Sequence, residues 1–215
     1  MSKMRAPALT LRGIRAREDG AADIFLDPPV LETGRLRLRR MRMRDAGDLY
    51  AWTSDPEVAR YVLWDAHQSL GETREYLRYI RSLYRRGLPS SWGVELKETG
   101  RLIGTIGIMS WSREHRSAEV GYSFGRPWWH HGYAPEALGC LLDLLFERTD
   151  VNRVEAQCDV RNGSSARVME KCGMRREGIL RQRLFNKGEA VDVMLYAILA
   201  ENWRARQAAK RGERP

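Results

Sequence analysis

Apolar and polar side chains alternate along several stretches of this chain with the two-residue period of a β-strand. Residues 118–124 show the cleanest alternation, because every second residue is apolar and the residues between them are Glu, Gly and Ser. Residues 102–109 are almost uninterruptedly apolar, which is typical of a central strand buried on both faces. Together these patterns predict strands over residues 35–43, 92–96, 102–109, 118–124, 154–160, 178–185 and 190–199.

Helical spacing fills the gaps between these predicted strands. Leucines recur every three or four residues between positions 138 and 145 and predict a helix over residues 135–148. A second predicted helix has one face formed by Thr73, Leu77, Ile80 and Tyr84. Helix N-cap residues are predicted at Asp45, at Asp55 before Pro56, at Ser69 before Glu72, and at Asn162. This order of elements predicts a mixed α/β chain with an antiparallel meander and one strand–helix–strand crossover.

One predicted domain accounts for residues 31–203, since the composition does not shift within that range. Residues 1–30 precede it as an extension, in which residues 9–19 resemble residues 36–45. Two interpretations of the extension stay open, an extra edge strand and a disordered segment. Residues 204–215 form a tail with five Lys or Arg side chains, which we expect to be solvated and frayed.

The chain has 215 residues and a formal charge of +9, from 37 Lys and Arg against 28 Asp and Glu. This surplus suits an anionic partner, which a nucleic acid, a phosphate-bearing ligand or an acidic surface would each provide. No run approaches the ~18 apolar residues of a membrane helix, so we expect no spanning segment.

The chain has three cysteines, Cys140, Cys158 and Cys172. They lie among apolar residues, and their spacings fit neither a zinc site nor a disulfide framework. We therefore expect reduced core cysteines in a cytoplasmic protein.

The segment before the helix at 135–148 carries the clearest chemical signal. The first amides of a helix have no partner within the helix and carry partial positive charge. Gly132 and Ala134 leave room for a ligand to approach the main chain, and Pro135 stands where a missing N–H costs nothing. The arrangement predicts a phosphate or diphosphate site, with a ligand-free tight turn as the alternative. Neither a Gly-Lys-Ser/Thr loop nor a complete Gly-x-Gly-x-x-Gly pattern is present, which disfavours ATP and NAD enzymes.

Residues 129–134, Trp-His-His-Gly-Tyr-Ala, resemble the Gln/Arg-x-x-Gly-x-Gly/Ala motif of the GNAT N-acetyltransferase superfamily. Trp129 departs from the usual Gln or Arg but is familiar in the Rim-type branch, the ribosomal-protein alanine N-acetyltransferases. Further segments typical of that branch follow in the right order at 31–39, Asp45, 55–57, 103–104, 119–122, 133–137, 162–165, 170–174, 177–178, Gly188, Asp192 and Tyr196. The resemblance implies a central, mostly antiparallel sheet with one splayed strand pair and helices on both faces.

The resemblance also implies how acetyl-coenzyme A (acetyl-CoA) is bound. The turn binds the diphosphate through the main chain of His130, His131, Gly132, Tyr133 and Ala134. The strand that contains Val120 and Tyr122 pairs with the pantetheine amides, and Asn162 hydrogen-bonds the same arm. Arg167 and Lys171 lie one helical turn apart and are candidates for the acidic end of the coenzyme, with a solvated basic face as the alternative.

Acetylation of an amine needs a base for the amine and a proton for the departing thiolate. Glu119, on the polar side of its strand, is the candidate base, acting through water, and an ordinary surface glutamate is the alternative. Asn162 and Ser165 match the family's Asn-x-x-Ser, which makes Ser165 the candidate donor to the sulfur; the alternative is that Asn162 only caps the helix and Ser165 is an ordinary first-turn residue. Tyr196 is a second candidate donor, with a core residue as the favoured alternative. His130 and His131 have no Asp, Glu or Cys at ligand spacing, so we expect no metal site.

Three functions stay open at this point. The first is acetyl transfer to a protein N-terminal α-amino group, a ribosomal one included. The second is the same chemistry on a small amine such as an aminoglycoside, a polyamine or an amino acid. The third is a nucleic-acid-binding module that uses the Arg-rich segments and the tail, although no known reading motif is present. For an acetyltransferase we expect contact with nucleic acid only through a ribosomal target, and a homodimer is left open.

Overall fold

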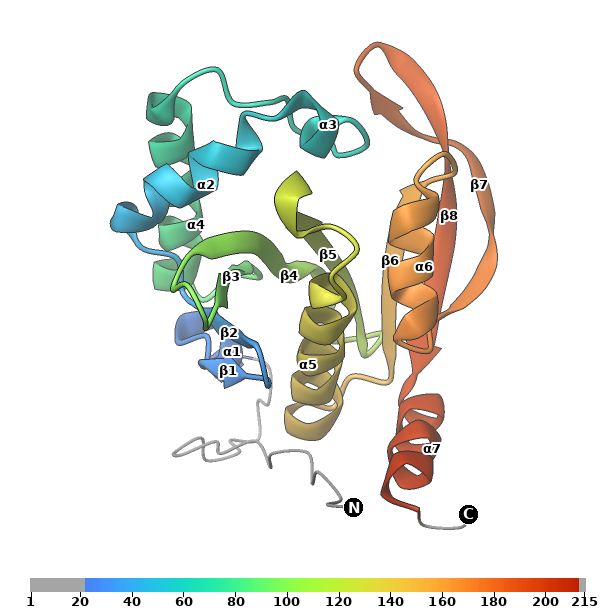
Figure 1. Ribbon diagram of the computed structural model, residues 1–215. Coiled ribbons are helices and arrows are strands. Elements are labelled where there is room, and N and C mark those ends of the chain that lie inside the picture. The colour runs from blue at the N-terminus through green and yellow to red at the C-terminus, as the bar shows by residue number, and fades with distance from the viewer. Residues whose placement is uncertain (1–21, 213–215) are drawn as a thin grey trace.

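The computed structural model describes residues 22–212, and one eight-stranded sheet forms its framework (Figure 1). Every neighbouring pair of these strands is antiparallel except β5 and β6, which run parallel. In sheet order the strands are β1 (Leu31–Glu32), β2 (Leu36–Arg39), β3 (Ser91–Leu96), β4 (Leu102–Ser112), β5 (Ser117–Phe124), β6 (Arg153–Asp159), β8 (Glu189–Leu199) and β7 (Arg175–Asn186). Each strand predicted from the alternation overlaps one of these, and the mixed α/β prediction is confirmed.

Strands β5 and β6 diverge after a short paired stretch. Only three residues of each strand are paired, the last being Glu119 opposite Glu155. Beyond that pair β5 continues to Phe124 and β6 to Asp159. The wedge-shaped gap beyond the last pair is called the fork below. This divergence is the splayed strand pair that the sequence resemblance predicted.

Helices cover both faces of the sheet, as predicted. The helices α5 (Tyr133–Arg148) and α6 (Gly163–Lys171) pack on one face, where Figure 1 shows them in front of the strands. The helices α2 (Ala46–Thr53) and α4 (Leu70–Arg86) enclose a separate apolar cluster on the other face, and the short α3 (Pro56–Ala59) follows α2. None of the helices in residues 22–212 combines the length and the hydrophobicity needed to cross a lipid bilayer.

The capping predictions can be compared with the helices residue by residue. Ser69 accepts a hydrogen bond from a main-chain N–H of the first turn of α4 at 3.2 Å. Asn162 accepts the equivalent bond at the start of α6 at 3.1 Å. Asp45 stands immediately before α2, but its carboxylate is buried against the Arg39 guanidinium at 2.8 Å and caps no amide of the helix. A buried ion pair therefore replaces the capping bond that we expected at Asp45.

All three cysteines are buried free thiols, which confirms the prediction of core cysteines. Burial raises the pKa of the Cys140 thiol to about 12. Burial likewise raises the pKa values of Cys158 and Cys172 to about 11. Because the thiolate is the reactive form, none of these thiols is suited to act as a nucleophile at neutral pH.

Both ends of the described chain are helical. Helix α1 (Ala22–Leu26) buries apolar side chains, while residues 9–19, one reading of which was an edge strand, lie outside the described residues. Helix α7 (Ala200–Arg211) includes most of the tail that we expected to be frayed. Trp203 is buried, and its indole N–H donates to Asp143 of α5 at 2.9 Å. Tertiary contact of this kind stabilises a helix that its local sequence alone does not predict.

Candidate active site

A tight turn leads from β5 into α5 through the short 3-10 helix η2 (Arg126–Trp128). Two residues of the turn have a positive φ, His130 at 65° and Gly132 at 80°. A Cβ on Gly132 would meet only an Arg35 nitrogen, at 3.5 Å. What favours glycine at this position is therefore the left-handed main chain rather than a lack of space. Both interpretations of the sequence required a turn before Pro135, and the structure has one; a phosphate site at this turn stays a prediction.

This turn leaves main-chain amides without a helical partner at the start of α5. The first helical hydrogen bond runs from the Glu136 N–H to the Gly132 carbonyl at 3.2 Å, so α5 uses none of the amides before Glu136. Pro135 has no N–H, and the residues before it, Gly132, Tyr133 and Ala134, all line one pocket. Unpaired amides together with the helix dipole attract an anion to this place.

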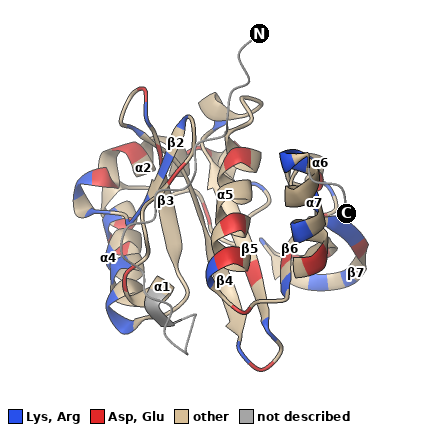
Figure 2. Cartoon of the chain, turned by 90° about the horizontal axis from the view of Figure 1, so that it is seen from below, with Lys and Arg blue, Asp and Glu red and all other residues tan. Residues whose placement is uncertain are grey.

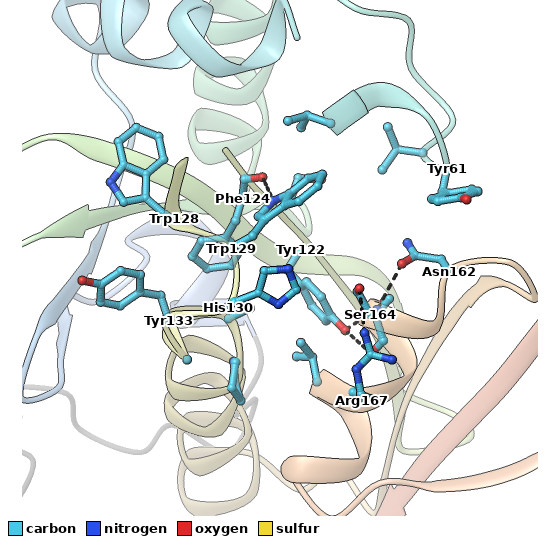
Figure 3. Close-up of a pocket in the computed structure, with 18 of the residues that line it drawn as sticks. Tyr61, Tyr122, Phe124, Trp128, Trp129, His130, Tyr133, Asn162, Ser164 and Arg167 are labelled. Carbon is cyan, nitrogen blue, oxygen red and sulfur yellow. Dashed lines mark hydrogen bonds between the residues drawn. The ribbon is translucent and has the colours of Figure 1, made fainter. Parts of the chain in front are cut away.

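The pocket has a volume of about 270 Å³ and lies between this turn, the part of β5 beside the fork, and α6 (Figure 3). The chain that follows α3 forms its far wall. It brings together many of the residues predicted from the sequence, namely Tyr122, His130, Gly132, Tyr133, Ala134, Asn162, Ser165, Arg167 and Lys171. Four predicted residues do not line it, namely Glu119, Val120, His131 and Tyr196.

Helix α6 begins at the same pocket. The Asn162 side chain, which caps α6, reaches the pocket together with Ser164 and Arg167, and Figure 3 shows all three on one side of it. The Arg167 guanidinium donates to the Ser164 hydroxyl at 3.0 Å, which holds the cation over the first turn of the helix. The N-termini of α5 and α6 therefore both contribute to one pocket.

Tyr122 and Ser165 join β5 to α6 inside this pocket. The Tyr122 hydroxyl lies 2.9 Å from the Ser165 hydroxyl and 3.0 Å from the Ser165 carbonyl oxygen. Burial raises the pKa of Tyr122 above its usual value, although the bond to Ser165 lowers it, so the phenol stays protonated at neutral pH. From the resemblance, Tyr122 was expected to bind the coenzyme through its strand, and no role was predicted for its hydroxyl. The available signal was that a buried tyrosine hydroxyl usually finds a polar partner.

Glu119 lies on the opposite side of β5 from Tyr122, because successive side chains of a strand alternate between faces. Its carboxylate accepts a hydrogen bond from the Gln157 amide of β6 at 2.9 Å. The carboxylate therefore lies at the base of the fork, on the face away from α5 and α6. Val120 is buried in the core, so its predicted contact with pantetheine rests on its main chain.

His131 and Tyr196 lie outside the pocket for different reasons. His131 is exposed and stacks on the Tyr133 ring, with ring centroids 5.7 Å apart. Tyr196 is buried on β8 and donates to Glu170 of α6 at 2.9 Å. Burial and the bond to Glu170 raise the pKa of Tyr196 to about 12. Since a carboxylate already holds the Tyr196 hydroxyl, Ser165 is the better placed of the two candidate proton donors.

The far wall of the pocket is a feature that the sequence did not predict. Tyr61 and Val62 line it. The tip of the β7–β8 hairpin holds this segment, because the Lys187 ammonium donates to the carbonyl oxygens of Val62 and Trp64 at 3.0 and 2.9 Å. Figure 1 shows the hairpin reaching toward α3. These partners are more than a hundred residues apart, and no local pattern indicates such a contact.

The charged side chains that line the pocket are mostly basic. Arg60, Arg167 and Lys171 stand against one acidic residue, Glu57. Figure 2 shows further Lys and Arg along β7, next to α6. This balance favours an anionic ligand. In the part of the chain that the structure describes, no three His, Cys, Asp or Glu side chains form a metal-binding group.

Comparison with known proteins places these features in a family. Residues 35–175 match the family model of the acetyltransferase (GNAT) domain. Over 173 residues the chain is 33% identical to the uncharacterized N-acetyltransferase p20 of Bacillus licheniformis, which covers 80% of this chain and 97% of that protein. Over 135 residues it is 28% identical to the ribosomal-protein-serine acetyltransferase of Escherichia coli, covering 63% and 74% of the two chains.

Solved structures share the fold. RimL, a ribosomal L7/L12 alpha-N-protein acetyltransferase solved in complex with coenzyme A, matches with a TM-score of 0.71. The identity is 20%, and the match covers 80% of this chain and 98% of that one. The family model spans the whole region from β2 to α6, including the turn, the fork and the pocket. The chain therefore belongs to the GNAT family of N-acetyltransferases.

Proposed function

We propose that this N-acetyltransferase transfers the acetyl group of acetyl-CoA to the α-amino group of a protein N-terminus. One observation carries the proposal: a single pocket connects the amides of the 130–134 turn with the fork. Ser165 reaches this place from the α6 side, and Glu119 stands at the base of the fork on the other face of the sheet. A donor bound on one face would thus meet an acceptor that arrives from the other.

The pocket suits acetyl-CoA in its charge and in its unpaired main-chain groups. In this proposal the diphosphate binds the turn before α5, which lines the same pocket as Arg167 and Lys171. Among residues 22–212, no strand pairs with the edge of β5 that faces β6 beyond Glu119. Unpaired strand groups need hydrogen-bonding partners, which the amides of an extended pantetheine arm provide. Asn162 lies where its side chain would contact the same arm.

The reaction assigns one proton transfer to each side of the sheet. The acceptor nitrogen attacks the thioester carbonyl carbon, so a C–N bond forms and the C–S bond breaks. Glu119, oriented by Gln157, takes the proton of the amine through a water molecule. Ser165 gives a proton to the departing thiolate, and the Tyr122 hydroxyl at 2.9 Å stabilises the serine oxygen.

The acceptor proposal rests on the pKa of the amine and on the relatives. An α-amino group has a pKa of about 8, against about 10 for a lysine side chain, so it needs less help from a base. The Escherichia coli relative is a ribosomal-protein-serine acetyltransferase, which also favours a protein acceptor.

Acetyl-CoA is expected to stabilise the protein against heat. A ligand at a hundred times its dissociation constant adds about 2.7 kcal/mol to the free energy of unfolding, or roughly 5–10 °C in Tm for a domain of this size. Differential scanning fluorimetry measures the shift, and an acceptor screen compares N-terminal peptides with polyamines and aminoglycosides. If acetyl-CoA did not shift Tm, the proposed coenzyme site would be wrong. If the enzyme acetylated only a small polycation, the proposed acceptor, a protein N-terminus, would be wrong.

Ser165→Ala is expected to slow turnover without weakening coenzyme binding. Loss of the proton donor should lower kcat by about 100-fold or more, while KM for acetyl-CoA stays within about twofold. Ser164→Ala is the matched control for kcat alone, since Ser164 bonds to Arg167 and not to Tyr122. Steady-state kinetics measures both variants. An unchanged kcat for Ser165→Ala would transfer the role to another group, with Tyr122→Phe as the next variant to measure.

A further inference from the structure

Arg35 lies between β1 and β2 and does not line the pocket, yet its side chain contacts the 130–134 turn. Its Nη1 donates to the His131 carbonyl oxygen at 3.0 Å. Its Nε and Nη2 lie 2.7 and 2.6 Å from one oxygen of Glu136, in the first turn of α5. The guanidinium also lies 4.5 Å from the centre of the Tyr133 ring. One side chain therefore contacts three successive parts of the turn and the helix that it begins.

The partner carboxylate is itself fully held. The other oxygen of Glu136 accepts hydrogen bonds from the Thr33 hydroxyl and, at 3.1 Å, from the Arg35 main-chain N–H. Burial raises the pKa of the Glu136 carboxyl, but the bonds from Thr33 and Arg35 outweigh it and leave the pKa below its usual value. Glu136 is therefore ionised at neutral pH, and the β1–β2 loop is tied to the start of α5.

The contact with His131 sets the direction of an amide. Peptide bonds in the described chain are trans, so the carbonyl of residue 131 and the N–H of Gly132 point in opposite directions. Arg35 fixes the carbonyl on its own side of the turn, which directs the N–H away from Arg35. A charged donor on the carbonyl also polarises the peptide group and strengthens its N–H as a donor.

The contact with Glu136 removes a charge conflict. A glutamate in the first turn of a helix is favourable for the helix itself, but it stands beside the place proposed for a diphosphate. Two anions at one helix terminus repel each other. The guanidinium beside Glu136 neutralises the carboxylate, so the helix N-terminus keeps its attraction for a second anion.

We propose that Arg35 is a positioning residue for the coenzyme: it holds the 130–134 turn in its anion-binding conformation and neutralises Glu136. This inference rests on the proposed function, because it assumes that the turn binds the diphosphate of acetyl-CoA. Arg35 touches neither the thioester nor the acceptor. Loss of the Arg35 side chain should weaken the binding of acetyl-CoA and not of the acceptor, and the effect should depend on the phosphates of the coenzyme.

Arg35→Gln is expected to raise KM for acetyl-CoA about tenfold while kcat at saturating donor and KM for the acceptor stay unchanged. S-acetylpantetheine, a donor without the diphosphate, should react equally well with the variant and the wild-type protein. Arg37→Gln is the matched control, because Arg37 pairs with Glu32 and Glu95 instead. Thermal unfolding of both variants checks that each is folded.

A second variant isolates the charge effect. In Arg35→Gln/Glu136→Gln the uncompensated carboxylate is gone, so part of the lost acetyl-CoA affinity should return. An unchanged KM for acetyl-CoA in folded Arg35→Gln, or an equal loss with S-acetylpantetheine, would overturn the inference. A wild-type protein that neither binds coenzyme A nor turns over acetyl-CoA would instead overturn the proposed function.

Discussion

Gly132→Val is expected to abolish the response of the protein to acetyl-CoA. Residue 132 has a φ of 80°, which a β-branched side chain avoids, so the turn must change its main-chain path. The amides of Tyr133 and Ala134 would then no longer converge on one anion. Misplacing a binding group by about 1 Å costs on the order of 100-fold in activity. Fluorimetry with acetyl-CoA and steady-state kinetics measure the two losses.

A glycine elsewhere separates strain from function. Gly100, in the β3–β4 turn, also has a positive φ, 68°, and a Cβ there would meet nothing within 4 Å. Gly100→Val should therefore lose a similar amount of stability, about 1–2 kcal/mol, while it keeps the thermal shift with acetyl-CoA. A normal shift in folded Gly132→Val would mean that the diphosphate binds somewhere other than this turn.

Local chemistry explains why much of the fold was predictable. The alternation of apolar and polar residues located β5, because successive side chains of a strand point to opposite faces of the sheet. Ser69 and Asn162 marked the starts of α4 and α6, because a cap needs only a side chain and an amide two or three residues away. Helix α5 begins at Tyr133, two residues before the predicted start at Pro135, because the left-handed Gly132 sets the boundary.

Contacts between distant residues explain what was missed. Arg35 and Glu136 are 101 positions apart in the sequence, and neither local segment predicts a contact with the other. The tail was judged by its charge, whereas the buried Trp203 fixes it as a helix against α5. The pocket shows the same division. The turn at Gly132 could be predicted from its local sequence, but the far wall of the pocket depends on the contacts of Lys187 with a distant segment.

The candidate base shows how far alternation alone can lead. The sequence placed Glu119 on the polar side of its strand, and the structure adds its position at the base of the fork, on the face away from α6. The fork itself followed from the family resemblance and not from alternation, because splaying depends on how β6 returns after α5. A base role for Glu119 therefore stays a prediction.

Glu119→Gln is expected to lower turnover by about 100-fold or more at pH about 6–7, because a general base contributes on the order of 100- to 10,000-fold. The loss should shrink above pH about 8, where an α-amino acceptor is already neutral. Coenzyme binding should not change, since Glu119 does not line the pocket. The pH profile of kcat, recorded with an N-terminal peptide, measures the effect.

Glu155→Gln is the matched control for this variant. Glu155 is the residue paired with Glu119 in register, on the same face of the sheet, but it forms an ion pair with Arg153 at 2.9 Å. Its replacement should leave kcat within about twofold across the pH range. Equal losses in both variants would indicate that the charge of the face, rather than one base, serves the reaction. Full activity of Glu119→Gln at low pH would show that the amine gives up its proton by another route.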